Sequence, residues 1–233
     1  MLISGIKTTT LLDYPGKVAA IIYTLGCNFR CGFCHNPEFV LPDEVRKQKD
    51  DVISEEAFFR FLETRKNFLE GVVICGGEPT IHQDLPEFAS KIKNLGYLVK
   101  LDTNGSHPRM LQTMLVQQLV DYVAMDIKAP IERYTSLVGV SHDTNAYRES
   151  IRLLLTSDID YEFRSTVIQG WHTEVDIREM AQDIAGAKKY FLQNYRPNQT
   201  LDPNFSGSSF TSEELIQLRD IAALHVANCR IRL

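Results

Sequence analysis

The chain has 233 residues, which is enough to bury a substantial core and suits one barrel or layered domain better than two small domains. Its 25 basic and 30 acidic residues give a net charge of −5, which argues against nucleic acid as the main partner. There is no apolar run of membrane-spanning length, and the start lacks the pattern of a secretory signal, so we expect a cytoplasmic protein with no membrane partner. Five cysteines do not make a disulfide scaffold in a chain of this size.

Apolar runs of strand length alternate with helical patterns along most of the chain. The predicted strands are 18–25, 71–75, 97–101, 122–126, 161–167 and 189–193. The predicted helices are 54–66, with Ser54 as N-cap, then 84–95, 108–119, 143–156, 173–185 and 211–225. The polar stretch 42–51 is expected to be a solvated loop.

Six alternating strand–helix units predict the α/β class, as a partial (β/α)6 barrel of parallel strands with helices outside. We expect residues 1–233 to form a single domain, with a cysteine-containing loop at 26–37 and a C-terminal segment, 198–233, that packs on the barrel. In such barrels the chemistry gathers at the carboxyl ends of the strands, so the sequences that follow each strand are the candidate site.

Three cysteines, Cys27, Cys31 and Cys34, follow the first predicted strand within one short loop. Thiolates bind zinc, copper(I) and iron–sulfur clusters. Structural zinc sites and electron-transfer clusters are normally closed by four protein ligands, whereas a four-iron cluster held by three cysteines leaves one iron open for a small molecule. We interpret the loop as a catalytic cluster site, with a zinc-binding or electron-transfer module as the non-catalytic alternative.

Polar and glycine-rich sequences follow the next strands. Gly76 and Gly77 would let a ligand approach the backbone, and Glu78 could accept from an ammonium group, although a Gly-Gly pair also simply turns the chain. The segment 102–105 could bind a ribose or a small cation, but a helix-entry turn is the simpler interpretation. Asp126 and Lys128 point the same way on a strand, either into the site or as an ordinary surface ion pair.

The spacing Cys-x3-Cys-x2-Cys, with Phe33 before the last cysteine, resembles the cluster motif of the radical S-adenosylmethionine (radical SAM) superfamily. The sequence Gly-Gly-Glu-Pro at 76–79 resembles its second motif. Within the superfamily the chain is most similar to activating enzymes of glycyl radical enzymes, over segments 13–16, 34–37, 101–105, 126–128, 137–140 and 167–171. Its closing part, 191–197 and 201–203, is similar to the anaerobic ribonucleoside-triphosphate reductase activating proteins.

The resemblance implies a [4Fe–4S] cluster on the three cysteines and S-adenosyl-L-methionine (SAM) on the open iron. An electron from flavodoxin or ferredoxin would cleave SAM, and the 5′-deoxyadenosyl radical would take hydrogen from a glycine of the partner, most directly anaerobic ribonucleotide reductase. No side chain of this chain need act as acid or base. The implied cofactor-binding residues are Phe33, Gly76, Gly77, Glu78, Pro79, Thr103, Asn104, Asp126, Lys128 and Val167.

The resemblance carries further expectations. Gly76, Gly77, Glu78 and Pro79 would contact the methionine amino group, Phe33 and Val167 would lie near the adenine, and a monovalent cation would bind near Asp102, Thr103 and Asp126. Asp13 and Tyr14 would touch the glycine loop of the partner. The chain departs from the family at Arg196, where pyruvate formate-lyase activase has histidine, and it lacks the insert for extra clusters, which predicts one cluster. Another radical SAM reaction, on a pyruvate formate-lyase-type partner, a peptide or a nucleoside precursor, is the alternative.

Overall fold

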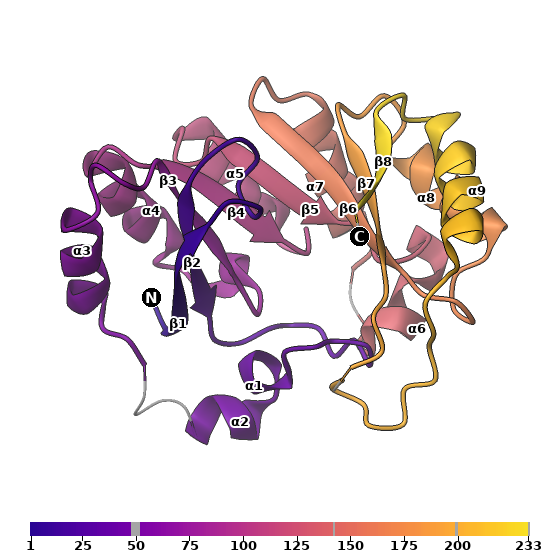
Figure 1. The fold of residues 1–233 in the computed structure, drawn as a ribbon, viewed down its shortest axis with the longest axis horizontal. Coiled ribbons are helices and arrows are strands. Elements are labelled where there is room, and N and C mark those ends of the chain that lie inside the picture. The colour runs from indigo at the N-terminus through magenta and orange to yellow at the C-terminus, as the bar shows by residue number, and fades with distance from the viewer. Residues whose placement is uncertain (48–51, 142, 199, 233) are drawn as a thin grey trace. The chain divides into compact units, whose positions relative to one another are not determined.

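The computed structural model describes residues 1–47, 52–141, 143–198 and 200–232, and the chain forms two compact units (Figure 1). The first unit comprises 1–28, 36–103 and 109–123, and the second comprises 29–35, 104–108 and 124–233. Each unit contains parallel strands and flanking helices, which confirms the predicted α/β class. Of the helices in the described ranges, none is long and apolar enough to cross a bilayer.

The sheet of the first unit has the strand order β1-β2-β3-β4. β1 (Ile3–Thr10) pairs antiparallel with β2 (Ala19–Thr24), whereas β3 (Gly71–Gly76) pairs parallel with β2, and β4 (Leu98–Thr103) pairs parallel with β3. Most residues of β2 and β3 are buried, as is typical of parallel strands that are covered on both faces. β5 (Tyr122–Asp126) starts in this unit and ends in the second.

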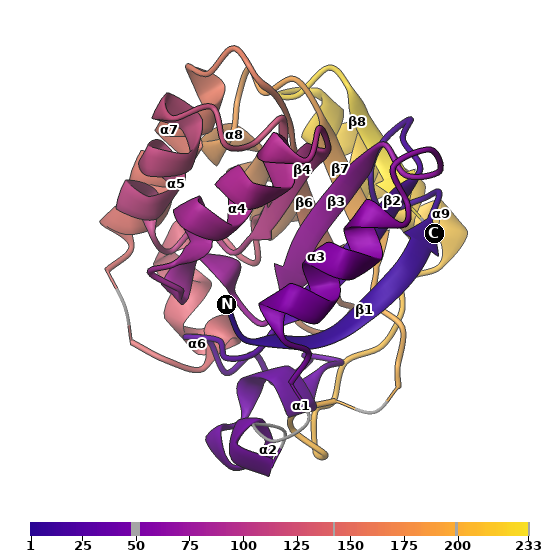
Figure 2. The ribbon, with the colours of Figure 1, turned by 90° about the vertical axis from the view of Figure 1, so that its left-hand side faces the viewer.

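Two helices of the first unit, α3 (Glu55–Glu63) and α4 (Leu85–Asn94), lie against its strands (Figure 2). Their side chains Phe58 and Phe88 stack with ring centroids 5.6 Å apart. The Ser54 hydroxyl accepts a hydrogen bond from the N–H of Ala57 at 3.1 Å, which confirms the predicted N-cap. The other described helices of this part are α1 (Pro37–Val40), α2 (Pro42–Lys47), the 3-10 helix η1 (Pro79–Ile81) and α5 (Pro108–Val116).

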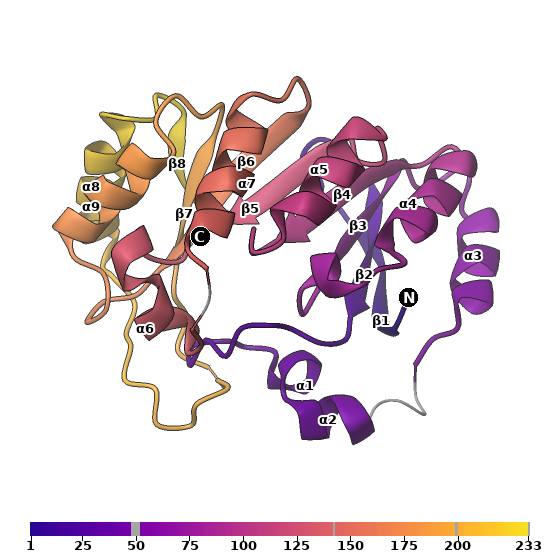
Figure 3. The same cartoon turned by 180° about the vertical axis from the view of Figure 1, so that it is seen from behind.

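In the second unit β6 (Asp160–Val167), β7 (Tyr190–Asn194) and β8 (Cys229–Arg232) are parallel neighbours. α8 (Glu174–Asp183) and α9 (Ser212–Ala223) lie side by side next to β7 and β8 (Figure 1, Figure 3). Each of these helices begins with a capping box, Thr173 with Asp176 and Thr211 with Glu214. The remaining described helices are the 3-10 helix η2 (Ile131–Arg133), α6 (Tyr134–Val138) and α7 (Asn145–Leu155).

The six predicted strands are confirmed, and the described residues form two further strands, β1 and β8, that the sequence does not predict. β1 is rich in threonine and largely accessible, and β8 has four residues of which two are arginine, so neither gives an apolar run. The prediction of a loop over 42–51 is wrong for α2, because Pro42 at the start and the acidic Asp43 and Glu44 in the first turn favour a helix. The rest of that stretch, 48–51, lies outside the described residues.

Candidate functional site

The three cysteines of the predicted cluster site belong to a loop in which the chain passes from one unit to the other. Cys27 lies in the first unit, and Cys31 and Cys34 lie in the second. The N–H of Cys34 donates to the carbonyl of Cys31 at 3.0 Å, which closes a tight turn between these two cysteines. Within the second unit, the turn presents two thiols from one short segment of backbone.

The residues just before Cys31 anchor this loop to α6. The N–H of Arg30 donates to the carbonyl of Val138 at 2.8 Å. Gly139, at the end of α6, has φ +71°, and a Cβ there would lie 2.5 Å from the carbonyl oxygen of Arg30. Phe29 is buried, and its ring centroid lies 6.4 Å from that of Tyr134. Only glycine allows this close approach of the two backbones, so the loop has a fixed attachment on its upstream side.

The thiols provide the donor set that an iron–sulfur cluster requires. None of the five cysteines, all of which lie within the described ranges, is part of a disulfide. Burial raises the pKa of Cys31 to about 11, while the positive charge of Lys128 acts in the opposite direction. A bound metal displaces the thiol proton, so the raised pKa does not prevent ligation. Within the described ranges, no three His, Cys, Asp or Glu side chains are grouped as in a preformed metal site, and the ligand set Cys27, Cys31 and Cys34 stays a prediction.

The glycine pair after β3 packs against the backbone at the end of β2. A Cβ on Gly76, whose φ is +114°, would lie 2.2 Å from the nitrogen of Thr24, and a Cβ on Gly77 would lie 2.0 Å from the oxygen of Gly26. The N–H of Gly77 donates to the Thr24 carbonyl at 2.9 Å, and the N–H of Glu78 donates to the Gly26 carbonyl at 2.8 Å. The fold itself therefore requires both glycines, as the turn interpretation expects, and their contact with SAM stays a prediction.

The Glu78 carboxylate joins the ends of β3 and β4. It is 1% exposed, and its Oε1 accepts from the N–H of Thr80 at 3.0 Å, from the Thr103 hydroxyl at 2.7 Å and from the Thr80 hydroxyl. Pro79, which is also buried, is the first residue of η1. Two predicted site residues, Glu78 and Thr103, are thus brought together within the first unit.

The segment after β4 has the hydrogen bonds of a turn that leads into a helix. Asp102 pairs with the buried Lys100 of the same strand. Asn104, which belongs to the second unit, accepts at its Oδ1 from the N–H of Ser106 at 2.9 Å. Gly105 follows with φ +75°, and α5 begins three residues later. This geometry agrees with the helix-entry interpretation, and binding of SAM or a cation by Asp102, Thr103 or Asn104 is not established by it.

Asp126 and Lys128 form a charged group with a third residue, Arg164 of β6. Asp126 Oδ2 accepts from Lys128 Nζ at 3.1 Å, and its Oδ1 accepts from Arg164 Nε at 3.0 Å. Burial alone would raise the pKa of the Asp126 carboxyl, but the two cations lower it to about 2. Burial would lower the pKa of Lys128, whereas the Asp126 carboxylate raises it above its usual range. The side chain of Lys128 is 17% exposed, so the surface-pair interpretation is wrong for this residue.

Lys128 also lies close to the cysteine loop. Its Nζ stands 5.9 Å from the ring centroid of Phe33, within the range of a cation–π contact. Val167, at the end of β6, is fully buried, and its carbonyl accepts from the N–H of Tyr195 at 3.0 Å. In the second unit the structure therefore places Lys128 against Phe33, whereas Arg196 is exposed.

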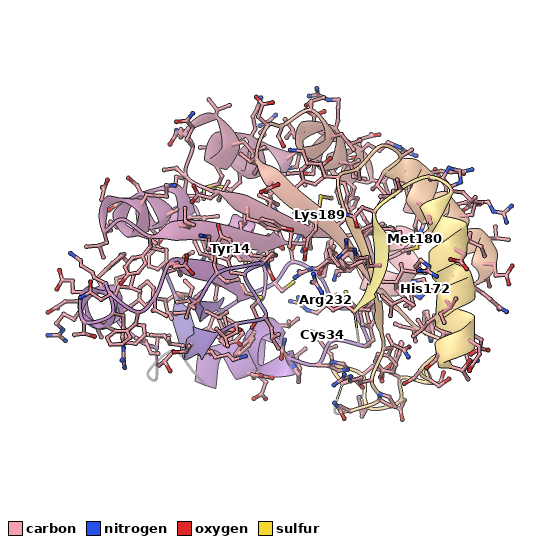
Figure 4. The ribbon with its side chains drawn as sticks, turned by 45° about the horizontal axis from the view of Figure 1, so that its top comes forward. Tyr14, Cys34, His172, Met180, Lys189 and Arg232 are labelled. Atoms are coloured by element: carbon pink, nitrogen blue, oxygen red, sulfur yellow. The ribbon has the colours of Figure 1, made fainter. Side chains whose placement is uncertain are left out.

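Two residues of this region, Arg164 and His172, are not predicted as site residues from the sequence. Arg164 lies in β6, but this strand also contains the buried charged residue Glu162, so no sequence signal singles out Arg164. His172, labelled in Figure 4 near α8, accepts at Nδ1 from the N–H of Ile168 at 3.1 Å, so its Nε2 carries the proton and donates to the Lys128 carbonyl at 2.9 Å. Burial lowers the pKa of His172, which keeps the ring neutral in this bridge.

The expectation that Tyr14 touches a partner conflicts with its position. Tyr14 is 4% exposed and packs in a core cluster of the first unit, with its ring centroid 6.0 Å from that of Tyr122 (Figure 4). Asp13 is more accessible, but its carboxylate accepts from the Thr10 hydroxyl and pairs with Lys7 at 3.4 Å. Both residues have clear roles in shaping the β1–β2 turn.

The sequence and the fold agree with those of known proteins. The family profile of the radical SAM superfamily matches residues 21–184. A protein of Methanocaldococcus jannaschii that is named as a glycyl-radical enzyme activating enzyme is 32% identical over 237 residues, which cover 99% of this chain and 95% of that protein.

Solved structures share the fold at lower sequence identity. A domain of pyruvate-formate lyase-activating enzyme from Bacteroides vulgatus has a TM-score of 0.57 at 19% identity, and the match covers 70% of this chain and 99% of that one. SuiB of Streptococcus suis, bound to S-adenosylmethionine, has a TM-score of 0.68 at 14% identity. The match covers 91% of this chain and 52% of the SuiB chain. With a profile match over most of its length and a relative that is similar from end to end, the chain belongs to the radical SAM superfamily.

Proposed function

We propose that this protein activates a glycyl radical enzyme. The observation that carries the proposal is the similarity to the Methanocaldococcus protein named for that activity, because it extends over 99% of the chain and 95% of that protein. We further propose anaerobic ribonucleoside-triphosphate reductase as the partner. The sequence likeness of 191–197 and 201–203 to the activating proteins of that reductase supports this choice.

Cys27, Cys31 and Cys34 would hold a single [4Fe–4S] cluster with SAM on its open iron. When bound, these groups supply one-electron cleavage of the sulfonium carbon–sulfur bond, giving methionine and a 5′-deoxyadenosyl radical that takes a hydrogen atom from a glycine α-carbon of the partner. Flavodoxin or ferredoxin would provide the electron. The superfamily membership and the soft thiol donors support this assignment.

The chain's own residues would bind and orient SAM rather than transfer protons. Lys128 and Arg164 provide positive charge for a carboxylate, and Asp126 provides an acceptor. The backbone of 76–79 would contact the amino group, Thr103 and Asn104 would line the site, and Phe33 and Val167 would lie near the adenine. Exclusion of water by the buried side chains would protect a radical that reacts with whatever it meets.

A monovalent cation near Asp102, Thr103 and Asp126 is a separate proposal. Both carboxylates already pair with cationic side chains, Asp102 with Lys100 and Asp126 with Lys128 and Arg164. A cation would therefore have to share these acids, and the test is whether SAM cleavage depends on potassium or sodium at constant ionic strength. If SAM cleavage is equally fast when a bulky organic cation replaces potassium and sodium, the proposed cation site is contradicted.

Two broader proposals follow from the same assignment. We propose that the two compact units act as one radical SAM domain over 1–233, which is supported by a profile match, 21–184, that includes parts of both units. We also propose a cytoplasmic location, supported by five described cysteines that form no disulfide, as is usual in a reducing compartment.

The decisive experiment is an anaerobic activation assay. The protein is reconstituted with iron and sulfide, reduced, and mixed with SAM and the candidate reductase. We expect 5′-deoxyadenosine and a glycyl radical signal in electron paramagnetic resonance. Cleavage of SAM without that signal would overturn the proposed partner and favour another radical SAM reaction, on a pyruvate formate-lyase-type partner, a peptide or a nucleoside precursor.

Two cysteine variants test the cluster assignment in the same assay. Cys34→Ser should lose the iron–sulfur absorption and SAM cleavage, because serine does not replace a soft thiolate. Cys229→Ser is the matched control: Cys229 is buried in β8, outside the cysteine loop, so its loss should leave iron content unchanged. Full cleavage activity in Cys34→Ser would contradict the assigned ligands.

A further inference from the structure

The segment after β7 returns to the cysteine loop and binds its backbone. The N–H of Leu201 donates to the carbonyl of Cys34 at 2.8 Å, and the N–H of Asp202 donates to the carbonyl of Gly32 at 3.0 Å. We call residues 200–210 the clasp segment. These two hydrogen bonds attach it to alternate residues of the cysteine loop, within the second unit.

An aromatic side chain of the clasp segment reinforces this attachment. The ring of Phe205 stacks on Trp171 with centroids 5.1 Å apart and lies 6.0 Å from the ring of Phe33 and 5.7 Å from that of Tyr195. A Cβ on Gly32 would lie 3.1 Å from the Phe205 ring, so the loop and the ring are in close contact. Phe205 thus connects the loop to the residues that follow β6 and β7.

The other end of the clasp segment is fixed to the ends of the strands. Ser208 and Gln169 exchange backbone hydrogen bonds of 2.9 and 3.2 Å, as in an antiparallel bridge. The N–H of Phe210 donates to Asn194 Oδ1 at 2.9 Å, and the Asn194 amide donates back to the Phe210 carbonyl at 2.8 Å. The clasp segment therefore connects the ends of β6 and β7 to the cysteine loop.

The hydrogen bonds also set the direction of two peptide groups. The peptide bonds of this loop are trans, so a carbonyl and the N–H of the following residue point in opposite directions. With the carbonyls of Gly32 and Cys34 held by the clasp segment, the N–H groups of Phe33 and His35 point away from it. Amide donors near cluster sulfurs stabilise the more negative, reduced form and raise the reduction potential.

We propose that Phe205 is a positioning residue, and that the clasp segment holds the backbone of 31–35 in its ligating conformation before the cluster is inserted. The inference rests on the proposed cluster at Cys31 and Cys34, but its first test needs neither the cluster nor a partner. It assigns a role to a C-terminal segment that carries no metal ligand. Its consequence is that the potential of the cluster depends on an aromatic contact outside the cysteine motif.

The test uses Phe205→Ala, the conservative Phe205→Tyr and Phe205→Leu, with Phe68→Ala as matched control, since Phe68 is 72% exposed in the first unit. Trp171 is the single tryptophan of the chain, so its fluorescence in the apo protein reports the Phe205 contact directly. In Phe205→Ala we expect red-shifted emission and roughly fivefold faster hydrogen exchange at the backbone amides of Leu201 and Asp202. Hydrogen exchange at the backbone amides of residues 31–35 should also be faster in Phe205→Ala. Phe205→Tyr should have the emission and the exchange rates of the wild type.

After reconstitution, a redox titration followed by electron paramagnetic resonance gives the potential of the cluster. We expect a lower potential and a lower iron content in Phe205→Ala, recovery in Phe205→Tyr, and wild-type values in Phe68→Ala. Unchanged amide exchange and unchanged potential, despite altered Trp171 emission, would overturn the proposal. If Phe205→Ala loses its circular dichroism spectrum, Phe205→Leu, which keeps apolar volume but loses the ring stacking, decides by the same two measurements. Failure of SAM cleavage with an intact clasp would instead count against the proposed function.

Discussion

Replacing Asp126 by asparagine removes the carboxylate that Lys128 and Arg164 share, and the structure gives the size of the effect. A pKa lowered from the ordinary 3.8 to about 2 corresponds to about 2 kcal/mol of stabilisation at neutral pH. The variant also leaves two cations, with side chains 17% and 14% exposed, close to each other without this carboxylate. Loss of one member of a buried charged group costs about 3–5 kcal/mol, and we expect about 3 because Asp126 is 30% exposed.

The assay is urea unfolding of the apo protein at pH 7, followed by circular dichroism, with Glu132→Gln as control. Glu132 is 86% exposed and pairs with Arg148 at 3.2 Å, so its loss should cost less than about 0.5 kcal/mol. The folded-state pKa of Asp126 is depressed, so its stabilisation is present above pH 4 and is lost as the pH falls toward about 2. The difference between wild type and Asp126→Asn should shrink over that window. A difference below about 0.5 kcal/mol at pH 7 would refute the reasoning.

Two further predictions address the turn after β3 and the histidine bridge. Gly77→Ala should destabilise the protein by more than about 2 kcal/mol and reduce iron uptake, because the new Cβ meets the Gly26 oxygen at 2.0 Å. In the same urea unfolding assay, Gly16→Ala, where φ is +71° and no atom lies within 4 Å, should cost only about 1 kcal/mol; equal costs would contradict the steric argument. His172 has a lowered pKa in the folded protein, so the unfolded chain takes up its proton first and stability should fall as the pH drops below 6.5. His172→Gln should weaken that dependence in urea titrations from pH 8 to pH 5, and identical slopes would exclude His172 as its source.

Much of the fold is readable from the sequence because its parallel strands are buried on both faces. β3 and β5 appear as continuous apolar runs, which burial on two sides requires. β1 could not be found in this way, since its antiparallel pairing leaves Lys7 and the threonines beside it accessible to solvent. α2 was hidden by its polarity, although Pro42 and the acids that follow it are signals of a helix start.

The candidate site is likewise only partly predictable from the sequence. The cysteine triplet is predictable because ligation requires those residue types at short spacing in one loop. Contacts between distant segments are not: Arg164 reaches Asp126 from the next strand, and Leu201 and Phe205 reach the cysteine loop from the far end of the chain. The spacing of residues in the sequence does not predict contacts between distant segments. The clasp segment therefore has the sequence of an ordinary loop, and only its hydrogen bonds in the structure distinguish it.

A residue that the fold itself requires gives little evidence about a ligand. The motifs of the candidate site therefore differ in how strongly they indicate a bound cofactor. Gly76 and Gly77 are glycine because the backbone of 24–26 leaves no space for a side chain, so their identity would be the same without any cofactor. Lys128, Arg164 and Asp126 differ, since two positive charges and one negative charge gather in a largely buried place at a cost in desolvation. Lys128 lowers the pKa of Cys31, but burial has the larger effect and raises it to about 11, and Asp126 also raises it. A carboxylate ligand beside Lys128 and Arg164 would offset part of that cost, so this charged group is stronger evidence for the proposed site than the glycine motif.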